Sequence, residues 1–115
     1  MSLIDPTQQA LEGAIQGAAL RQQALAGNLA NVNTPGYQRR DVDFHAALRT
    51  AVERGRPPAF ATATETGVVR ADGGGVDVDR ESAELAKNAL EQQALVSVAR
   101  VRIEVLVHAM GAGAA

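Results

Sequence analysis

Residues 79–110, DRESAELAKNALEQQALVSVARVRIEVLVHAM, decide the fold because apolar side chains recur in them at alternating steps of four and three. This spacing is the pattern of a helix that lies along a partner helix. A glutamine interrupts the series once. We call the series the C-terminal seam: Leu85, Ala89, Gln92, Val96, Ala99, Ile103, Leu106 and Met110. The pattern predicts a long C-terminal helix that begins near Asp79 and ends at about Met110.

The residues at both ends of this predicted helix suit its termini. Asp77 or Asp79 can serve as the N-cap, since a carboxylate accepts the free N–H groups of a first turn. Glu81 and Glu84 add negative charge near the positive end of the helix dipole. We expect the tail 111–115 to stop the helix.

The same alternation occurs near the beginning of the chain. Asp5 is a suitable N-cap and Pro6 fits the first helical position, so a helix is predicted from about Asp5 to Asn31. Its apolar series, the N-terminal seam, is Leu11, Ile15, Ala18, Gln22, Leu25, Leu29 and Val32. The opposite face carries mostly small residues: Gly13, Gly17, Leu20, Ala24 and Gly27. Such a face either lets a neighbouring backbone approach closely or is a solvated face that tolerates small residues.

The C-terminal helix carries a second apolar stripe, roughly opposite its seam. The second stripe consists of Leu90, Ala94, Val98, Val101 and Val105. A helix of 30 residues is about 45 Å long, whereas a compact chain of this size has a radius of gyration near 13 Å. Leaving each such side chain in water forgoes on the order of 1.5–3 kcal/mol. We therefore expect an elongated subunit whose second stripe is covered by neighbouring chains.

The middle of the chain is rich in turn-forming residues. Asn33-Thr34-Pro35-Gly36 has the order of a type II turn. A short helix is predicted from Phe44 to Glu53, and residues 55–75 are interpreted as loop or extended chain, with a hairpin around 66–70 as an alternative. The predicted fold class is mainly α, with the two long helices packed as an antiparallel coiled-coil pair. The predicted segments are 1–33, 34–78 and 79–115.

The composition argues against several classes of function. The 115 residues carry a formal net charge of −2 and no cysteine, so we expect no nucleic-acid field, no thiolate metal site and no disulfide. Nothing approaches the ~20 apolar residues of a membrane span, and the N-terminus lacks the basic segment of a cleaved secretory signal. His45 and His108 lack the spacing of a zinc enzyme. We expect no cofactor, no small-molecule substrate and no enzymatic activity.

Three stretches carry a resemblance to a known family. Residues 25–37, LAGNLANVNTPGY, resemble the N-terminal signature of flagellar axial proteins, which include rod, hook and hook-associated subunits. Residues 39–44, RRDVDF, narrow the resemblance to proximal rod proteins of the FlgB type. Residues 76–90, VDVDRESAELAKNAL, resemble the C-terminal motif of that family. Between Phe44 and Val76 the chain shows little that matches.

The resemblance implies a structural subunit of the bacterial flagellar rod that transmits torque for motility. It implies a place in the basal body, export by the flagellar type III apparatus without a cleaved signal, and helical assembly with other rod subunits. Membrane-embedded ring and export-gate proteins are the other implied partners. A Phe-x-x-x-hydrophobic element, here Phe44 and Leu48, is implied to dock at the export gate. A pair at i and i+4 shares a helix face, but Phe44 as a core residue is an equally open reading.

The chemistry of the residues in the signature turn explains why they suit the end of a helix. These residues are Asn28, Asn31, Asn33, Thr34, Pro35, Gly36 and Tyr37. Asparagine bonds local backbone and tolerates the left-handed conformation where a helix ends. We expect Tyr37 to anchor the turn.

Two other functions remain open on the sequence. The same seams suit a small coiled-coil adaptor or regulatory binding module, which would form a defined small oligomer in solution. Nucleic-acid binding rests only on Arg39-Arg40, Arg54 and Arg56, and the net acidity disfavours it.

Overall fold

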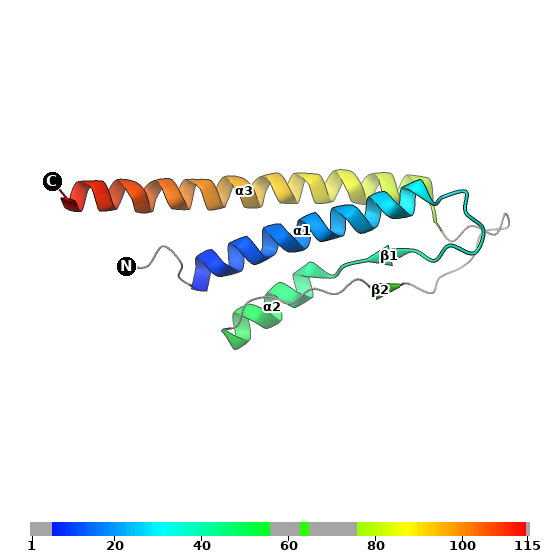
Figure 1. The fold of residues 1–115 in the computed structure, drawn as a ribbon, viewed down its shortest axis with the longest axis horizontal. Helices are drawn as coiled ribbons and strands as arrows, with labels where there is room; N and C mark the ends of the chain where they lie inside the picture. Colours follow the sequence, from blue (N-terminus) through cyan, green and yellow to red (C-terminus); the bar gives the residue numbers. More distant parts are fainter. Residues whose placement is uncertain (1–5, 56–62, 65–75, 115) are drawn as a thin grey trace.

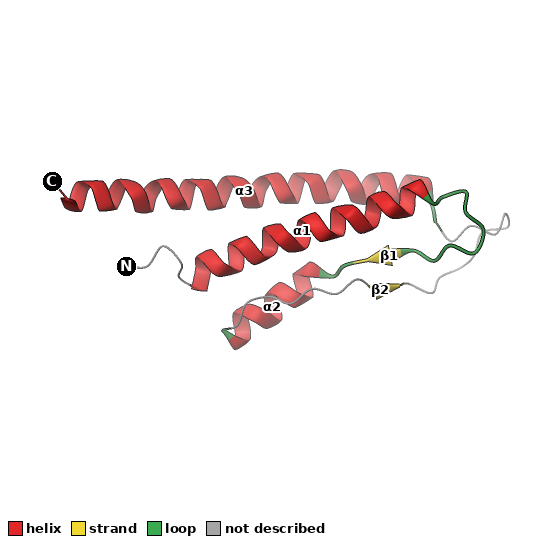
Figure 2. Cartoon of the chain, in the orientation of Figure 1, coloured by secondary structure: helices red, strands yellow, loops and turns green. Residues whose placement is uncertain are grey.

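The computed structural model describes residues 6–55, 63–64 and 76–114, with side-chain burial described for 6–55 and 76–111. The elements are α1 (Pro6–Ala30), β1 (Arg40–Asp41), α2 (Phe44–Arg54), β2 (Ala63–Thr64) and α3 (Val78–Ala114). Helices α1 and α3 lie antiparallel and side by side, and β1 and α2 lie on the other flank of α1 (Figure 1). Helices dominate the described chain (Figure 2). The predicted mainly α fold with an antiparallel pair of long terminal helices is confirmed.

The molecule is elongated. Its extents are 68 × 26 × 14 Å and its radius of gyration is 18.1 Å. A compact chain of this length would have a radius of gyration of about 13 Å. The difference follows from α3, whose 37 residues exceed the 25 residues of α1. At 1.5 Å per residue, α3 is longer by about 18 Å.

The sequence predicts the beginning of α3 correctly but not its end. Asp77 is the N-cap, since its Oδ1 accepts the backbone N–H groups of Asp79 at 2.9 Å and Arg80 at 3.3 Å. At the other end the helix continues through Gly111 to Ala114, so the predicted stop after Met110 is wrong. A glycine inside a helix costs only about 1 kcal/mol, and no proline follows to force an end.

Helix α2 begins and ends as its sequence suggests. The Asp43 side chain accepts the backbone N–H of Ala46 at 3.1 Å and caps the first turn. The helix ends at Arg54, one residue beyond the prediction, where Gly55 adopts the left-handed conformation (φ 63°) and its N–H meets the carbonyls of Ala51 and Val52. That glycine turns the chain away from the helix axis.

The predicted type II turn after α1 is confirmed. The Thr34 carbonyl accepts the N–H of Tyr37 at 3.2 Å, with Pro35 and Gly36 between them. Gly36 has φ 76°, as the third position of this turn requires. Among the described residues only glycines have positive φ, so the asparagines at the end of α1 do not use the left-handed conformation that this residue type tolerates.

A two-stranded ladder joins two parts of the middle segment and was not predicted. Arg40 pairs with Thr64 and Asp41 with Ala63, antiparallel. The hairpin considered around residues 66–70 lies outside the described residues.

The small-residue face of α1 is covered by the chain's own middle segment. Gly13 and Gly17 are buried, and Leu20 and Ala24 pack against a core cluster of Ala18, Val42 and Phe44. The reading of this face as solvated is therefore wrong. Because α1 lies between α3 and the β1–α2 flank, small side chains let both neighbours approach it.

Candidate assembly site

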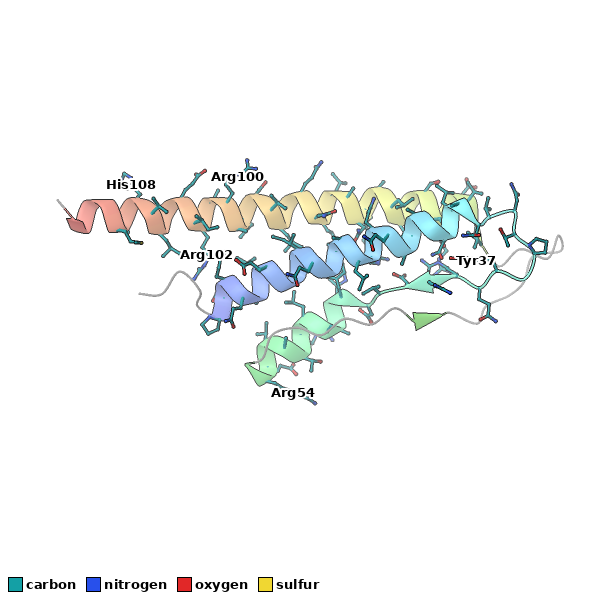
Figure 3. All side chains as sticks on the ribbon, in the orientation of Figure 1. Tyr37, Arg54, Arg100, Arg102 and His108 are labelled. Carbon is teal, nitrogen blue, oxygen red and sulfur yellow. The ribbon has the colours of Figure 1, made fainter. Side chains whose placement is uncertain are left out.

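The second stripe of α3 is exposed. Leu90, Val98, Val101 and Val105 are between 54% and 67% exposed, although each is a large apolar side chain. Figure 3 shows Arg100 and His108 on the side of α3 turned away from α1, and Arg102 on the side toward it. Exposed apolar groups grouped in this way are typical of a protein–protein contact surface.

Several residues in the distal part of the C-terminal seam are exposed as well. Val96 and Ile103 are more than a third exposed and Met110 is 59% exposed. Val107, which belongs to neither predicted series, is also exposed. The α1 helix is too short to cover this end of α3. The distal half of α3 therefore presents apolar side chains on two sides.

The other seam residues lie between α1 and the rest of the chain. Leu25 is fully buried, and other seam residues are half-buried, among them Leu11, Ile15, Leu29, Leu85 and Leu106. On α3 the buried positions nearest α1 are Glu81, Asn88 and Ala99. The observed contact face of α3 is thus turned slightly from the predicted seam, toward polar residues. Their hydrogen bonds explain the difference.

Six polar side chains from α1, α3 and the β1 segment form what we call the junction network: Arg21, Asn28, Arg39, Asp41, Glu81 and Glu84. Arg21 Nε donates to Asp41 Oδ1 at 2.9 Å and its Nη2 donates to Glu84 Oε2 at 2.6 Å. Arg39 pairs with Glu81 and, at 3.1 Å, with Asp41. Glu81 is 0% and Arg39 4% exposed. These charges are buried, and they are paired, as buried charges must be.

Asn28 ties the signature turn into this network. Its Nδ2 donates to the Arg40 carbonyl at 2.6 Å and to Glu81 Oε2 at 3.2 Å. Its Oδ1 accepts the Arg40 N–H at 2.9 Å and the Tyr37 hydroxyl at 3.4 Å. The Tyr37 hydroxyl lies 3.7 Å from the place where a Cβ at Gly27 would stand. Tyr37 thus holds the turn against α1 of its own chain.

The remaining signature residues act more locally or face solvent. Asn31 Nδ2 donates to the Gly27 carbonyl at 2.8 Å, and its Oδ1 accepts the Thr34 hydroxyl at 3.1 Å. Asn33 is exposed. The expectation that asparagines bond nearby backbone holds for Asn31, whereas Asn28 reaches across to β1 and α3.

The Arg21 pairs shift the ionisation of both carboxylates. Burial raises the pKa of Asp41, but hydrogen bonds from Arg21 and the Val42 backbone more than offset it, and the net pKa is lowered. The hydrogen bond from Arg21 is the main cause of the lowered pKa of Glu84. For Arg21, burial lowers the pKa, but the two carboxylates raise it above its ordinary value.

These shifts predict acid sensitivity. Asp41 and Glu84 have lower pKa values folded than unfolded, so the unfolded chain binds their protons more readily. Their stabilisation is complete above the ordinary values of 3.8 and 4.5 and is lost as pH falls below them. We expect the urea midpoint to fall between about pH 6 and about pH 3. The variant Asp41→Asn with Glu84→Gln should start lower and fall less, and an equal fall in both proteins would contradict the assignment.

Phe44 and Leu48 are not available together on the folded surface. Phe44 is buried in the core cluster with Ala18 and Val42, and Leu48 is half-buried. His45 stacks on Phe44, with ring centroids 4.1 Å apart, and its Nε2 lies 3.0 Å from Glu91 Oε2. Both contacts hold the start of α2 in place.

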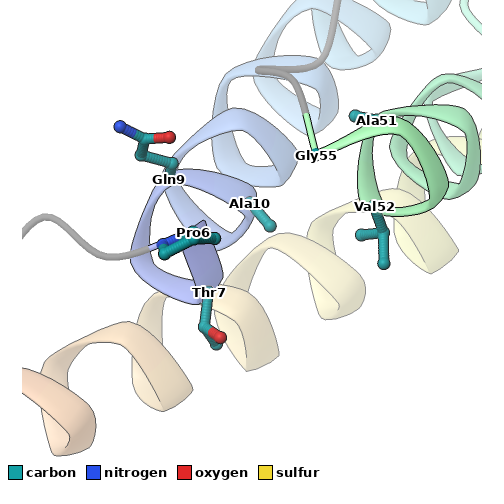
Figure 4. A pocket seen from close by; sticks show the side chains of 7 residues that line it. All are labelled: Pro6, Thr7, Gln9, Ala10, Ala51, Val52 and Gly55. Carbon is teal, nitrogen blue, oxygen red and sulfur yellow. The ribbon is translucent and has the colours of Figure 1, made fainter.

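Two hollows flank the N-terminal end of α1. A groove of about 490 Å³ between α1 and α3 is lined by Thr7, Leu11, Ser97, Val98, Val101 and Arg102. A pocket of about 270 Å³ separates α1 from the end of α2 and is lined by Pro6, Thr7, Gln9, Ala10, Ala51, Val52 and Gly55 (Figure 4). None of the described residues lining that pocket is titratable, so the lining offers no acid or base.

Metal-binding clusters and membrane-spanning helices are absent from the part of the chain that the structure describes. No described group of three or more histidine, aspartate or glutamate side chains could hold a metal ion. No described helix is both long and apolar enough to cross a bilayer.

The chain is similar to known proteins in the regions just described. Residues 9–38 match the family described as "Flagella basal body rod protein". The flagellar basal body rod protein FlgB of Escherichia coli (strain K12) is 33% identical over 118 residues, which cover 83% of this chain and 86% of that protein. The chain belongs to the FlgB family. The FlgB protein of Bacillus subtilis (strain 168) is 34% identical over 113 residues, covering 84% and 86%. That of Proteus mirabilis (strain HI4320) is 56% identical over 36 residues, covering 31% and 26%.

Residues 9–38, which match the family of flagella basal body rod proteins, contain several of the structural features described above. The matched stretch covers most of α1 and the turn, and contains Arg21, Asn28 and Tyr37. It therefore includes the α1 contribution to the junction network. The exposed end of α3 lies outside the matched stretch.

Proposed function

We propose that this chain is a structural subunit of the flagellar basal body rod that assembles through the distal half of α3. One observation carries the proposal. Four apolar side chains of the second stripe, including Val101, are more than half exposed, whereas the buried charges of Arg39 and Glu81 near the signature turn are paired. Covering a stripe of this kind stabilises by about 1.5–3 kcal/mol per large side chain.

The family supports the partners and the location that we propose. The relatives are named as basal body rod proteins, so other rod subunits are the first candidates for covering the second stripe. Membrane-embedded ring and export-gate proteins are the further partners we propose. In this assembly the stiff helix pair would transmit torque across the rod.

Export would precede folding. Phe44 is buried in the folded chain, so docking of Phe44 and Leu48 at the export gate requires a chain in which α2 has not yet packed on α1. We therefore propose that this element acts on the newly made chain, and that burial of Phe44 follows export.

A charge in the second stripe tests the assembly surface. Val101→Asp changes a side chain that is already 56% exposed, so we expect little change in the stability of the free chain. In a bacterial host that lacks its own copy, we expect the variant to be exported but absent from purified basal bodies, with swimming lost.

Gln93→Asp is the matched control, because Gln93 is an exposed polar residue of the same helix. We expect it to assemble and support swimming. Normal incorporation of Val101→Asp would contradict the proposal. A defined small oligomer of the free parent chain, closed through the second stripe, would instead favour the adaptor function.

A further inference from the structure

Apolar packing leaves the register of α3 against α1 poorly determined. The α3 helix has 37 residues against 25 in α1, and the C-terminal seam continues to Met110, beyond the part that α1 covers. Sliding α3 by one heptad, about 10 Å, would bring further apolar residues of the same series against α1. Much of the α1 surface is alanine and glycine, which interlock weakly. Something else must select the observed register.

The polar contacts described between α1 and α3 require particular residues to lie opposite each other, so they form in one register of the two helices. Arg21 meets Glu84 at 2.6 Å, and Asn28 meets Glu81 at 3.2 Å. One turn further along, Asn88 Nδ2 donates to the Ala18 carbonyl at 2.9 Å and to Gln22 Oε1 at 2.7 Å. Glu81 and Asn88 are fully buried. A slide by one heptad would break these contacts and leave Asn88 on the contact face without its partners, which is strongly unfavourable.

We infer that the junction network, together with Asn88, selects the register in which α3 packs on α1 and so sets how far its apolar end extends beyond α1. A buried asparagine in the core between two helices is known to specify register at some cost in stability, and Asn88 is such a residue on the contact face of α3. Arg39 and Asp41 also fix the position of the β1 segment relative to the two helices, since Arg39 pairs with Glu81 of α3 and Asp41 pairs with Arg21 of α1. This inference concerns the fold of the single chain and does not depend on the assembly partner.

The chain has no cysteine, so a pair of introduced cysteines can carry spin labels without background. Gln9 on α1 and Ser82 on α3 are exposed and lie toward opposite ends of the helix pair, so a slide changes the distance between them directly. The parent should give one narrow distance distribution. The variant Arg39→Met, Glu81→Leu, Asn88→Leu should remain helical and add a second population displaced by about 10 Å.

The matched control is Arg54→Met with Glu53→Leu, the same kind of change at exposed positions of α2. It should keep the single distribution. If the triple variant does not fold, the single variant Asn88→Leu tests the inference instead. We expect its distance distribution to show a minor population with the same displacement. A single undisplaced distribution in the folded triple variant, or in Asn88→Leu where that decides, would show that apolar packing alone sets the register.

Discussion

Replacing Glu81 by glutamine is expected to lower the free energy of unfolding by about 3 kcal/mol, the lower end of the range for breaking a buried ion pair. The substitution keeps the shape of the side chain but removes its charge, and Arg39 remains 4% exposed beside it. Asp41 still pairs with Arg39 at 3.1 Å, which is why we expect the lower end. Urea titration followed by circular dichroism measures the change.

Glu53→Gln gives the matched control, because Glu53 is an exposed residue of α2. Its effect should stay within about 0.5 kcal/mol. Equal stabilities of the two variants would mean that the charge of Glu81 contributes nothing to the fold. The junction network would then not be the feature that holds α1, β1 and α3 together.

Ending the chain after Leu95 is expected to abolish swimming. The truncation removes Val98, Val101 and Val105, three of the four exposed large apolar residues of the second stripe, together with the end of α3 that α1 does not cover. It leaves the junction network intact, because every member precedes residue 95. Swimming in soft agar and immunoblots of purified basal bodies report motility and incorporation separately.

A chain that ends after Met110 is the appropriate control. It lacks only the last turn of α3 and should support swimming like the parent. Normal motility of the shorter truncation would remove the distal half of α3 from the assembly surface.

The helices could be predicted because their signals are local. The heptad spacing, the Asp77 cap and the Thr34-Pro35-Gly36 turn each act within a few residues, and both long helices occur where the spacing predicts them. The end of α3 was missed because glycine weakens a helix without forbidding it.

The junction network could not be predicted because its members come from three segments. Pairing Arg39 with Glu81, 42 residues away in sequence, requires the antiparallel register to be known first. Heptad spacing also favours apolar over polar residues at the contact positions, whereas the polar residues Glu81 and Asn88 lie on the observed contact face. The adjacent charges Arg39, Arg40 and Asp41 beside a turn were the available signal. The roles of the seam, the second stripe and the Phe44–Leu48 element in assembly and export stay predictions.

The unequal lengths of α1 and α3 give the subunit a direction. At the end that carries the signature turn, the buried charges of Arg39 and Glu81 pair with each other. The opposite end, where α3 continues alone, exposes apolar side chains and is the end that we propose to bind other subunits. When a contact joins unlike patches and does not close into a ring, each added copy presents a further free apolar end, so growth is open and one-way. We therefore expect the unequal helix lengths of the single molecule to determine the polarity of a filament built from this chain.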